Sequence, residues 1–312
     1  MLKVLFYRRY RSFSGGHLKV WDYFTHVRQS PQHVPHVFFS DDSVWDATNP
    51  WVGAAEHRLG SWRTEDADVL FLAGGDWTAI TEPVRRRPPV PVINLVQHVR
   101  HGDPANRRYR FLEHRAIRIC VSQEVADAVA KSGRVNGPLF VIPNGVDSEL
   151  FSTPTPEDRR DIDILIAGLK QPELAERLRP EIETLAPRVE VLTTRLPRAE
   201  FLSRLSRSVV TVFLPNPTEG FYLPALEGMG LGTLVVCPDC AGNRSFCLPG
   251  RNSFRPEHRE SAILDAVKAS LRLSAADRRE MLSTARATAF QHSLAAERSA
   301  FLAILNNLAQ IW

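Results

Sequence analysis

Two glutamates, Glu219 and Glu227, flank a turn that has the features of an anion-binding site. Gly220 allows the backbone to approach a ligand closely, and Pro224 fits the first turn of a helix, where its missing N–H is no loss. Such a helix start presents N–H groups and a positive dipole end, which suit a diphosphate. A carboxylate accepts hydrogen bonds from the vicinal hydroxyls of a sugar. The segment therefore predicts a site for a nucleotide sugar.

Other segments of the chain support this interpretation over the alternative that the two glutamates only cap and solubilise a helix start. The Glu-x7-Glu block resembles the signature of retaining glycosyltransferases of the GT-B fold, in the large group 1 (family 4-like) family. Further segments resemble that family in the same order along the chain: the glycine-rich loop Ser14-Gly15-Gly16, the strand Val92–His98, the helix start Val121–Glu124, the turn Val141–Asp147 and the tail Leu234–Asn252. The resemblance extends from about Leu2 to Phe254.

The resemblance implies a role for each matching residue. Glu227 would hold the ribose hydroxyls and Glu219 would contact the donor sugar. His98 would lie across a cleft near the reacting sugar, although His101 is an alternative imidazole. The remaining implied donor contacts are Gly15 and Gly16 on an N-terminal loop, Thr194 near the base, Lys170 at the diphosphate, and Gly220, Phe221, Tyr222 and Leu223, whose backbone would bind that diphosphate. His98, Glu219 and Lys170 would form the catalytic set.

The chain departs from the family pattern at the predicted diphosphate site. The family carries both Arg and Lys after the first strand of its second domain, whereas residues 168–172 read Gly-Leu-Lys-Gln-Pro. Lys170 would then act alone, or Arg195 or Arg244 would supply the second cation. Tyr222 also stands where the family often has glycine.

The sequence predicts neither a metal nor a cofactor, only a UDP- or GDP-linked sugar as substrate. Its two closest approaches to an Asp-x-Asp ion site are Asp41-Asp42 and Asp161-x-Asp163, and the latter begins a strand. Cys237 and Cys240, with Cys247, form a single CxxC pair, which is weak evidence for zinc. The formal charge of +4 is a mild excess that suits anionic partners, such as nucleotide phosphates or an anionic membrane surface, without choosing among them. We expect a cytoplasmic protein that binds no nucleic acid.

The positioning elements are two successive series of strands and helices. Near-continuous apolar runs of strand length are typical of parallel strands covered on both faces. They are Leu2–Tyr7, Val34–Phe39, Asp68–Leu72, Pro91–Val96, Ile117–Val121, Leu139–Ile142, Ile162–Ala167, Val189–Leu192, Val209–Leu214 and Thr233–Cys237. A Pro-rich polar stretch, residues 152–160, separates the two series.

This pattern predicts an α/β protein of two doubly wound, Rossmann-like domains facing a cleft, as in GT-B proteins. We expect an N-terminal acceptor domain over residues 1–153, with a C-terminal helix over 292–312 packing back on it. Residues 154–291 would form the donor domain. The arginine-rich stretch 100–118 could be a basic surface for nucleic acid or anionic lipid, but such a run is more often a solvated helix face or the acceptor side of a transferase cleft.

The predicted function is retaining, metal-independent transfer of a sugar from a nucleotide-diphosphate sugar to an acceptor. The acceptor would be a glycan, a lipid-linked molecule or a small molecule. Two alternatives stay open: a GT-B protein that binds a nucleotide or glycan without turnover, and a nucleotide-sugar epimerase of similar architecture.

Overall fold

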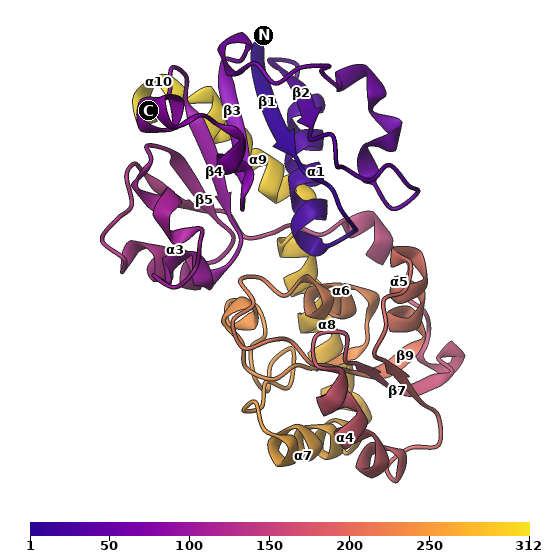
Figure 1. Ribbon diagram of the computed structural model, residues 1–312. Coiled ribbons are helices and arrows are strands. Elements are labelled where there is room, and N and C mark those ends of the chain that lie inside the picture. The colour runs from indigo at the N-terminus through magenta and orange to yellow at the C-terminus, as the bar shows by residue number, and fades with distance from the viewer. The chain divides into compact units, whose positions relative to one another are not determined.

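A computed structural model describes residues 1–312 and divides the chain into two compact units (Figure 1). The first unit comprises Met1–Asn144 and Ala295–Trp312, and the second comprises Gly145–Leu294. Each unit is built on one parallel sheet with helices packed against it.

The first unit contains a six-stranded parallel sheet in the order β2-β1-β3-β4-β5-β6. Its strands are β1 (Leu2–Arg8), β2 (His33–Phe39), β3 (Val69–Ala73), β4 (Val92–Val96), β5 (Ile117–Cys120) and β6 (Leu139–Val141). Every residue of β3, β4 and β5 is buried, which is the reason that these runs are almost entirely apolar. The chain moves to one side from β1 to β2 and to the other side at β3, so the strand order reverses between β1 and β3.

The helices of the first unit begin at polar caps, as the sequence indicates. They are α1 (Gly15–Arg28), α2 (Glu82–Arg86), α3 (Gln123–Ala130), α9 (Leu294–Asn306) and α10 (Leu308–Ile311), with 3-10 turns η1 (Pro50–Gly53), η2 (Ala55–His57), η3 (Thr64–Asp66), η4 (Asp76–Ala79), η5 (Val99–Gly102) and η6 (Tyr109–Glu113). Ser14 Oγ accepts from His17 N at 3.3 Å at the start of α1. Ser122 Oγ accepts from Val125 N at 3.3 Å, so Ser122 caps α3 within the helix start Val121–Glu124 that resembles the family.

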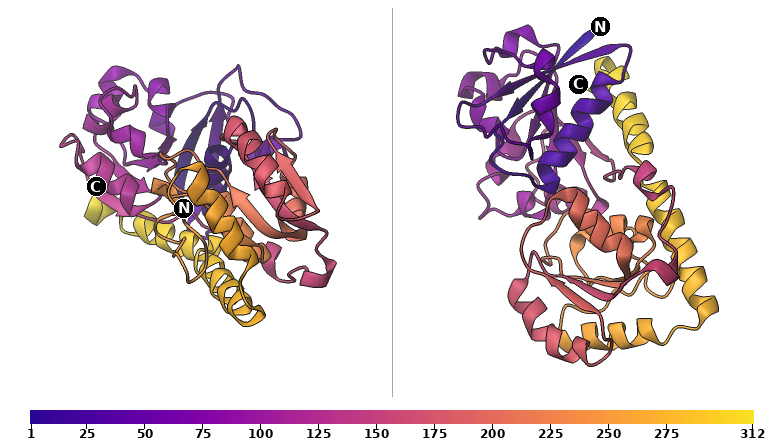
Figure 2. Two further views of the ribbon diagram at one scale, coloured as in Figure 1. Left: turned by 90° about the horizontal axis from the view of Figure 1, so that it is seen from below. Right: turned by 90° about the vertical axis from the view of Figure 1, so that its right-hand side faces the viewer.

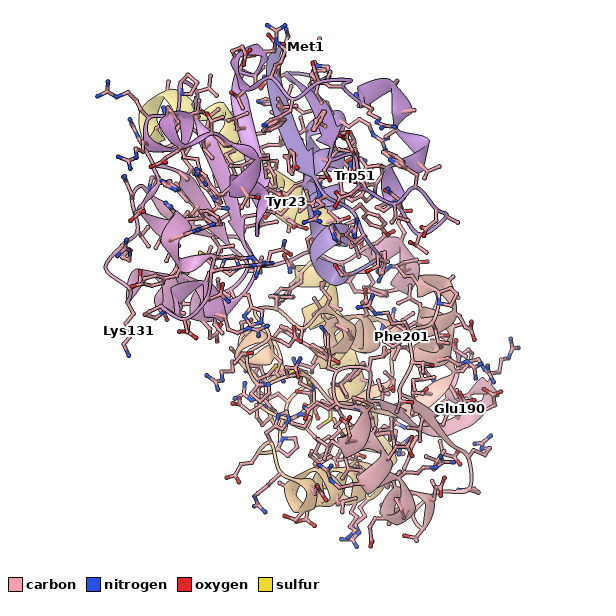
Figure 3. The ribbon with its side chains drawn as sticks, in the orientation of Figure 1. Met1, Tyr23, Trp51, Lys131, Glu190 and Phe201 are labelled. Carbon is pink, nitrogen blue, oxygen red and sulfur yellow. The ribbon has the colours of Figure 1, made fainter.

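The C-terminal helix α9 packs against α1 within the first unit, and both lie side by side in two views (Figures 1 and 2). Glu297 of α9 accepts from Lys19 Nζ of α1 at 2.6 Å, and Asp22 lies 2.8 Å from the same ammonium. All three groups are buried, so the two carboxylates compensate for the buried charge. Phe301 of α9 meets the ring of Tyr23, which is labelled in Figure 3, edge to face at 4.7 Å between ring centroids.

The second unit contains a four-stranded parallel sheet in the order β10-β9-β7-β8. Its strands are β7 (Ile162–Ala167), β8 (Val189–Leu192), β9 (Ser208–Phe213) and β10 (Leu234–Val236). Its helices are α4 (Pro172–Glu183), α5 (Arg198–Arg207), α6 (Leu223–Leu231), α7 (Glu260–Leu271) and α8 (Ala275–Gln291), with 3-10 turns η7 (Ser148–Phe151), η8 (Glu157–Arg159) and η9 (Ala241–Asn243). Here the strand order reverses between β7 and β9.

The two units divide after Asn144, whereas the sequence analysis placed the boundary at residue 153. Val146 N donates to His292 O at 2.8 Å, and Phe151 packs against Phe290 at 6.3 Å between ring centroids. Residues 145–153 therefore make their contacts inside the second unit. The polar, proline-rich composition of residues 152–160 indicates a largely exposed segment. It does not mark the boundary between the two units.

Candidate active site

The predicted donor residues of the second unit gather where its strand order reverses. In open parallel sheets, ligands bind at the carboxyl ends of the strands beside such a reversal. The loop after β7 carries Lys170 and the loop after β9 carries Glu219. Lys170 Nζ lies 3.4 Å from Glu219 Oε1, with side-chain exposures of 50% and 17%. The fold thus joins two predicted catalytic residues that are far apart in sequence.

The turn between Glu219 and α6 is hydrogen-bonded to the 3-10 turn η9, which contains Gly242. The amide of Tyr222 donates to Gly242 O at 2.8 Å, and the amide of Leu223 donates to Phe221 O at 3.2 Å. A Cβ on Gly242 would lie 2.6 Å from Phe221 N, so only glycine allows this close approach. Two of the amides predicted to bind a diphosphate therefore make hydrogen bonds within the chain.

Glu227 is buried inside α6 with only 2% of its surface exposed. Its Oε1 accepts a hydrogen bond from Arg198 Nη2 at 2.6 Å. Arg198 is the first residue of α5, and it follows the loop that carries the predicted base contact Thr194, which is exposed. A buried carboxylate needs a cation or hydrogen-bond donors to stay ionised. Arg198 supplies that cation.

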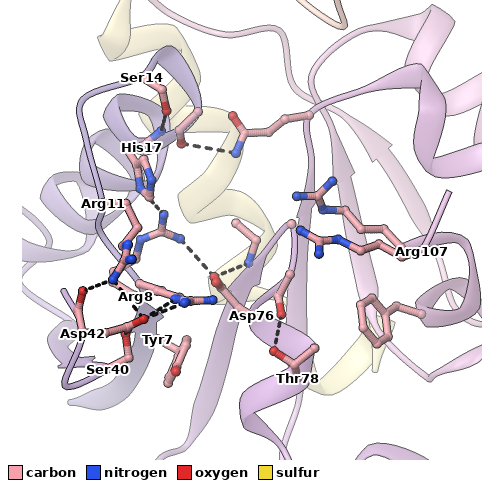
Figure 4. A pocket seen from close by; sticks show the side chains of 18 of the residues that line it. Tyr7, Arg8, Arg11, Ser14, His17, Ser40, Asp42, Asp76, Thr78 and Arg107 are labelled. Carbon is pink, nitrogen blue, oxygen red and sulfur yellow. Dashed lines mark hydrogen bonds and ion pairs between the residues drawn. The ribbon is translucent and has the colours of Figure 1, made fainter.

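In the first unit, the reversal between β1 and β3 also carries an ion pair. Arg8 at the end of β1 donates from Nη1 to Asp76 Oδ2 at 3.0 Å (Figure 4). Asp76 also accepts from Ala73 N at 2.9 Å, and Gly74 makes that turn possible with a φ of +57°. Arg8 Nη2 lies 2.5 Å from His17 Nδ1. Arg8 therefore joins the end of the sheet to the first turn of α1.

A cavity of about 740 Å³ opens beside this ion pair. Its cationic lining residues are Arg8, Arg9, Arg11, Arg107, Arg108 and Arg110, and its acidic ones are Asp42 and Asp76. The predicted glycine-rich loop contributes Gly16, whose carbonyl accepts from Gln97 Nε2 at 3.3 Å. Gly15 is the exposed first residue of α1. We name this cavity, with its eight charged residues, the arginine pocket.

Burial and the arginines shift the pKa values of ionisable groups around the arginine pocket. Burial, followed by the charge of Arg8, lowers the pKa of His17 to about 4. Burial raises the pKa of Asp76 to about 6, against the opposing effect of Arg8. Burial, followed by Arg108, lowers the pKa of His101 to about 3. Both histidines are therefore neutral near pH 7.

His98, the predicted catalytic imidazole, ends β4 and caps the 3-10 turn η5. Its Nδ1 lies 3.1 Å from Arg100 N, and its Nε2 lies 3.1 Å from Arg100 Nη2. A neutral imidazole offers one acceptor nitrogen, so only one of these contacts is a hydrogen bond at a time. Gln97, one residue earlier, lines the arginine pocket, whereas His98 lies outside its lining.

Comparison with known proteins assigns the second unit. The family described as "Glycosyl transferases group 1" matches residues 141–272. Residues 141–272 therefore resemble a group 1 glycosyltransferase domain, and we call them the group 1 domain. No curated protein matches the sequence.

Solved structures extend the similarity to the whole fold. Anabaena Alr3699/HepE in complex with UDP and glucose is 15% identical, with a TM-score of 0.76 over 98% of this chain and 100% of that chain. Sucrose-phosphate synthase from Thermosynechococcus elongatus is 13% identical, with a TM-score of 0.72 over 99% of both chains. A glycosyltransferase from Rickettsia africae is 11% identical, with a TM-score of 0.73 over 99% of both chains. The predicted fold class, two Rossmann-like domains of the GT-B type, is confirmed.

Sequence reasoning missed the partner of Glu227 in the group 1 domain. It considered Arg195 and Arg244 as additional cations, but Arg244 Nη2 binds Asp239 Oδ2 at 2.6 Å on the surface. Arg195 is exposed on the loop after β8. The position of Arg198 directly after Pro197, at the start of a helix beside the predicted base contact, is the signal that could have identified it.

The remaining residues and features that the sequence analysis considered have the following surroundings in the structure. The Tyr222 ring is buried and packs against Phe213 at 6.0 Å between ring centroids. The four cysteines of the chain are buried free thiols. No group of three or more His, Cys, Asp or Glu side chains is arranged to hold a metal ion. None of the helices combines the length and the apolar character needed to cross a bilayer.

Proposed function

We propose that the chain transfers a sugar from a nucleotide-diphosphate sugar to an acceptor, with retention at the anomeric carbon and without a metal ion. The observation that carries this proposal is the pairing of Lys170 with Glu219 at the strand reversal of a group 1 glycosyltransferase domain. Loss of a nucleoside diphosphate leaves negative charge on the leaving group. Prearranged cations and N–H groups at that position stabilise the transition state.

Lys170 is the cation that this site offers to the diphosphate. Its ion pair with Glu219 is half exposed, and such pairs contribute little, about 0–1 kcal/mol. A bound diphosphate can therefore take the ammonium at small cost. Because the amides of Tyr222 and Leu223 are used within the chain, we expect the amides of Gly220 and Phe221 to contact the phosphates.

The two glutamates then divide the sugars of the donor between them. Glu219, once Lys170 moves to the diphosphate, accepts hydrogen bonds from the hydroxyls of the transferred sugar. A carboxylate has about four acceptor sites. Glu227 can therefore accept from the ribose hydroxyls while it keeps its hydrogen bond from Arg198. UDP is the first candidate for the nucleotide, since the similar HepE structure is a complex with UDP and glucose.

The test is incubation with UDP-, GDP-, dTDP- and ADP-sugars in the presence of candidate acceptors. We expect release of one nucleoside diphosphate together with a glycosylated product. The anomeric coupling constant of that product by NMR reports retention, and an inverted product would contradict it. Release of an epimerised free sugar without acceptor would identify an epimerase instead.

Metal independence is tested separately by adding EDTA to the transfer assay. Both site carboxylates already face cations, Lys170 and Arg198, so we expect the rate to change by less than about twofold. The control is addition of Mg²⁺ or Mn²⁺ after EDTA. A rate that collapses with EDTA and returns with the ion would overturn this part of the proposal.

A second candidate function is binding of a nucleotide sugar without turnover. The observation that favours it is the loop of residues 168–172, which contains one cation where the family carries two. Tight binding of a nucleotide sugar, with neither transfer nor slow hydrolysis over a day, would select this function.

A further inference from the structure

The arginine pocket has a large excess of positive charge. Arg8, Arg9 and Arg11 approach from the β1 side, and the segment that carries Arg107 approaches from the opposite side (Figure 4). The two acidic residues are already paired: Asp76 with Arg8 at 3.0 Å, and Asp42 with Arg9 at 2.6 Å and Arg11 at 3.1 Å. The second trio, Arg107, Arg108 and Arg110, makes no direct ion pair with either carboxylate, although Asp76 also attracts Arg108 at longer range. Six cations around two carboxylates leave a positive excess that attracts an anionic ligand.

Two of these arginines also hold buried N–H donors that lack an acceptor. Arg8 is only 5% exposed, and its Nε has no hydrogen-bond partner. Arg108 Nε is likewise buried without a partner. It lies beside Gly74, where a Cβ would come within 3.6 Å of it. A buried donor without an acceptor is unfavourable, so a ligand oxygen that accepts from it would bind more tightly than one that meets only paired donors.

The N-terminal turn of α1 lies at the same cavity. Ser14, Gly16 and His17 all line it, and α1 is 14 residues long, so its positive dipole end faces the pocket. The pKa of Arg108 is lowered by burial and then by the charges of Arg107 and Arg100, as expected where cations crowd together. The helix N-terminus is independent of the arginine count and points to the same class of ligand.

We propose that the arginine pocket binds a phosphate group on the acceptor substrate, so that the protein glycosylates a phosphorylated molecule. This inference rests on the proposed transferase function. Guanidinium groups bind phosphate oxygens in bidentate pairs. The pocket contains six arginines, which is more than a ligand with a single carboxylate would need. The volume of about 740 Å³ holds a sugar phosphate, since small-molecule sites range over about 300–1,000 Å³. The diphosphate of the donor has its own site in the second unit, beside Lys170.

The direct test compares glucose 6-phosphate with glucose by isothermal titration against the full chain. We expect the phosphate ester to bind at least about tenfold more tightly, because charge-assisted hydrogen bonds are roughly twice as strong as neutral ones. Arg108→Ala should remove that preference. Arg108→Lys should restore part of it, since lysine keeps the charge but loses the planar fork.

Arg87→Ala is the matched control, because Arg87 is an exposed arginine outside the pocket and its loss changes the net charge equally. Circular dichroism and the melting temperature of each variant check that it folds. If Arg108→Ala does not fold, the exposed Arg107→Ala takes its place, with a smaller expected loss. Equal losses of phosphate-ester binding in Arg87→Ala and Arg108→Ala would overturn the proposal.

Two further arms identify the source of the phosphate and separate this proposal from the transferase proposal. Sedimentation with phosphatidic acid vesicles, against phosphatidylcholine vesicles, tests a lipid phosphate. Arg108-dependent binding in either the sugar arm or the lipid arm supports the inference. Absence of such binding in both arms overturns it. UDP titration reads the donor site alone. Loss of UDP binding in Arg108→Ala would make the pocket a donor phosphate site and overturn the inference, whereas absent UDP binding in the unaltered chain would count against the transferase proposal only.

Discussion

The two units place an ion pair at the same topological position, but the pairs differ in burial. In the first unit, the side chains of Arg8 and Asp76 are 6% and 10% exposed. In the second unit, those of Lys170 and Glu219 are 50% and 17% exposed. The reversal of strand order fixes where each site lies. Burial then decides whether the pair is a fixed part of the structure or an exchangeable pair that a ligand can separate.

The largest expected effect of this difference is on stability. Arg8→Ala leaves the carboxylate of Asp76 buried without its cation, so we expect a loss of about 3–5 kcal/mol in the free energy of unfolding. Lys170→Ala should change it by less than about 1 kcal/mol. Urea denaturation measures both. Equal losses in the free energy of unfolding would show that burial does not distinguish the two pairs.

The double variant Arg8→Ala/Asp76→Ala is the control for that comparison. It removes the buried charge together with its partner, so it should recover part of the stability lost in Arg8→Ala. A double variant that is less stable than Arg8→Ala would mean that the loss comes from packing and from the contact with His17.

The second effect concerns catalysis, where the exposed pair Lys170–Glu219 should matter more than the buried pair Arg8–Asp76. Lys170→Ala should lower kcat about 100-fold, because it removes a prearranged cation from the leaving group. Glu227→Ala should instead weaken UDP affinity, since Glu227 is the expected ribose contact. Steady-state kinetics and titration with UDP measure the two changes. Unchanged UDP affinity in both variants, with unchanged kcat, would remove the site from the second unit.

A third, smaller effect tests how the turn after Glu219 is positioned. Gly242→Ala places a Cβ 2.6 Å from Phe221 N, so the turn must shift. We expect UDP affinity to fall about tenfold, with little change in the arginine pocket. Gly53→Ala is the control, because a Cβ there meets nothing within 4 Å. A Gly242→Ala variant that binds UDP normally would show that the turn does not contact the phosphates.

The sequence predicted most elements well because their apolar runs and their caps are local signals. The strands Ile162–Ala167 and Val189–Leu192 were predicted with their observed limits. Pro224 lies in the first turn of α6, as expected from its missing N–H. The Glu-x7-Glu spacing also indicated the family, because both glutamates belong to one short turn and helix.

The contacts that define the two sites were not predictable, because they join residues that are distant in sequence. Arg8 and Asp76 are 68 residues apart, and Arg198 and Glu227 are 29 apart. The use of the Tyr222 amide by Gly242 depends on a loop that follows a later strand. The arginine-rich stretch 100–118 was visible, but its pairing with Arg8, Arg9 and Arg11 around one cavity required the fold.

The smallest effect is the dependence of anion binding on pH in the arginine pocket. The pKa of Asp76 is about 6, raised by burial, so its charge disappears as the pH falls below 6. Arg8, Arg108 and the amide of Ala73 face this carboxyl, and their attraction for an anion is then no longer reduced by the charge of Asp76. His17, with a pKa of about 4, stays neutral in this range. Sulfate should therefore bind a few-fold more tightly at about pH 5 than at about pH 7.5. Sulfate suits the titration because it does not itself change charge there, and Asp76→Asn should make the affinity independent of pH. An affinity that still rises in Asp76→Asn would assign the titration to another group.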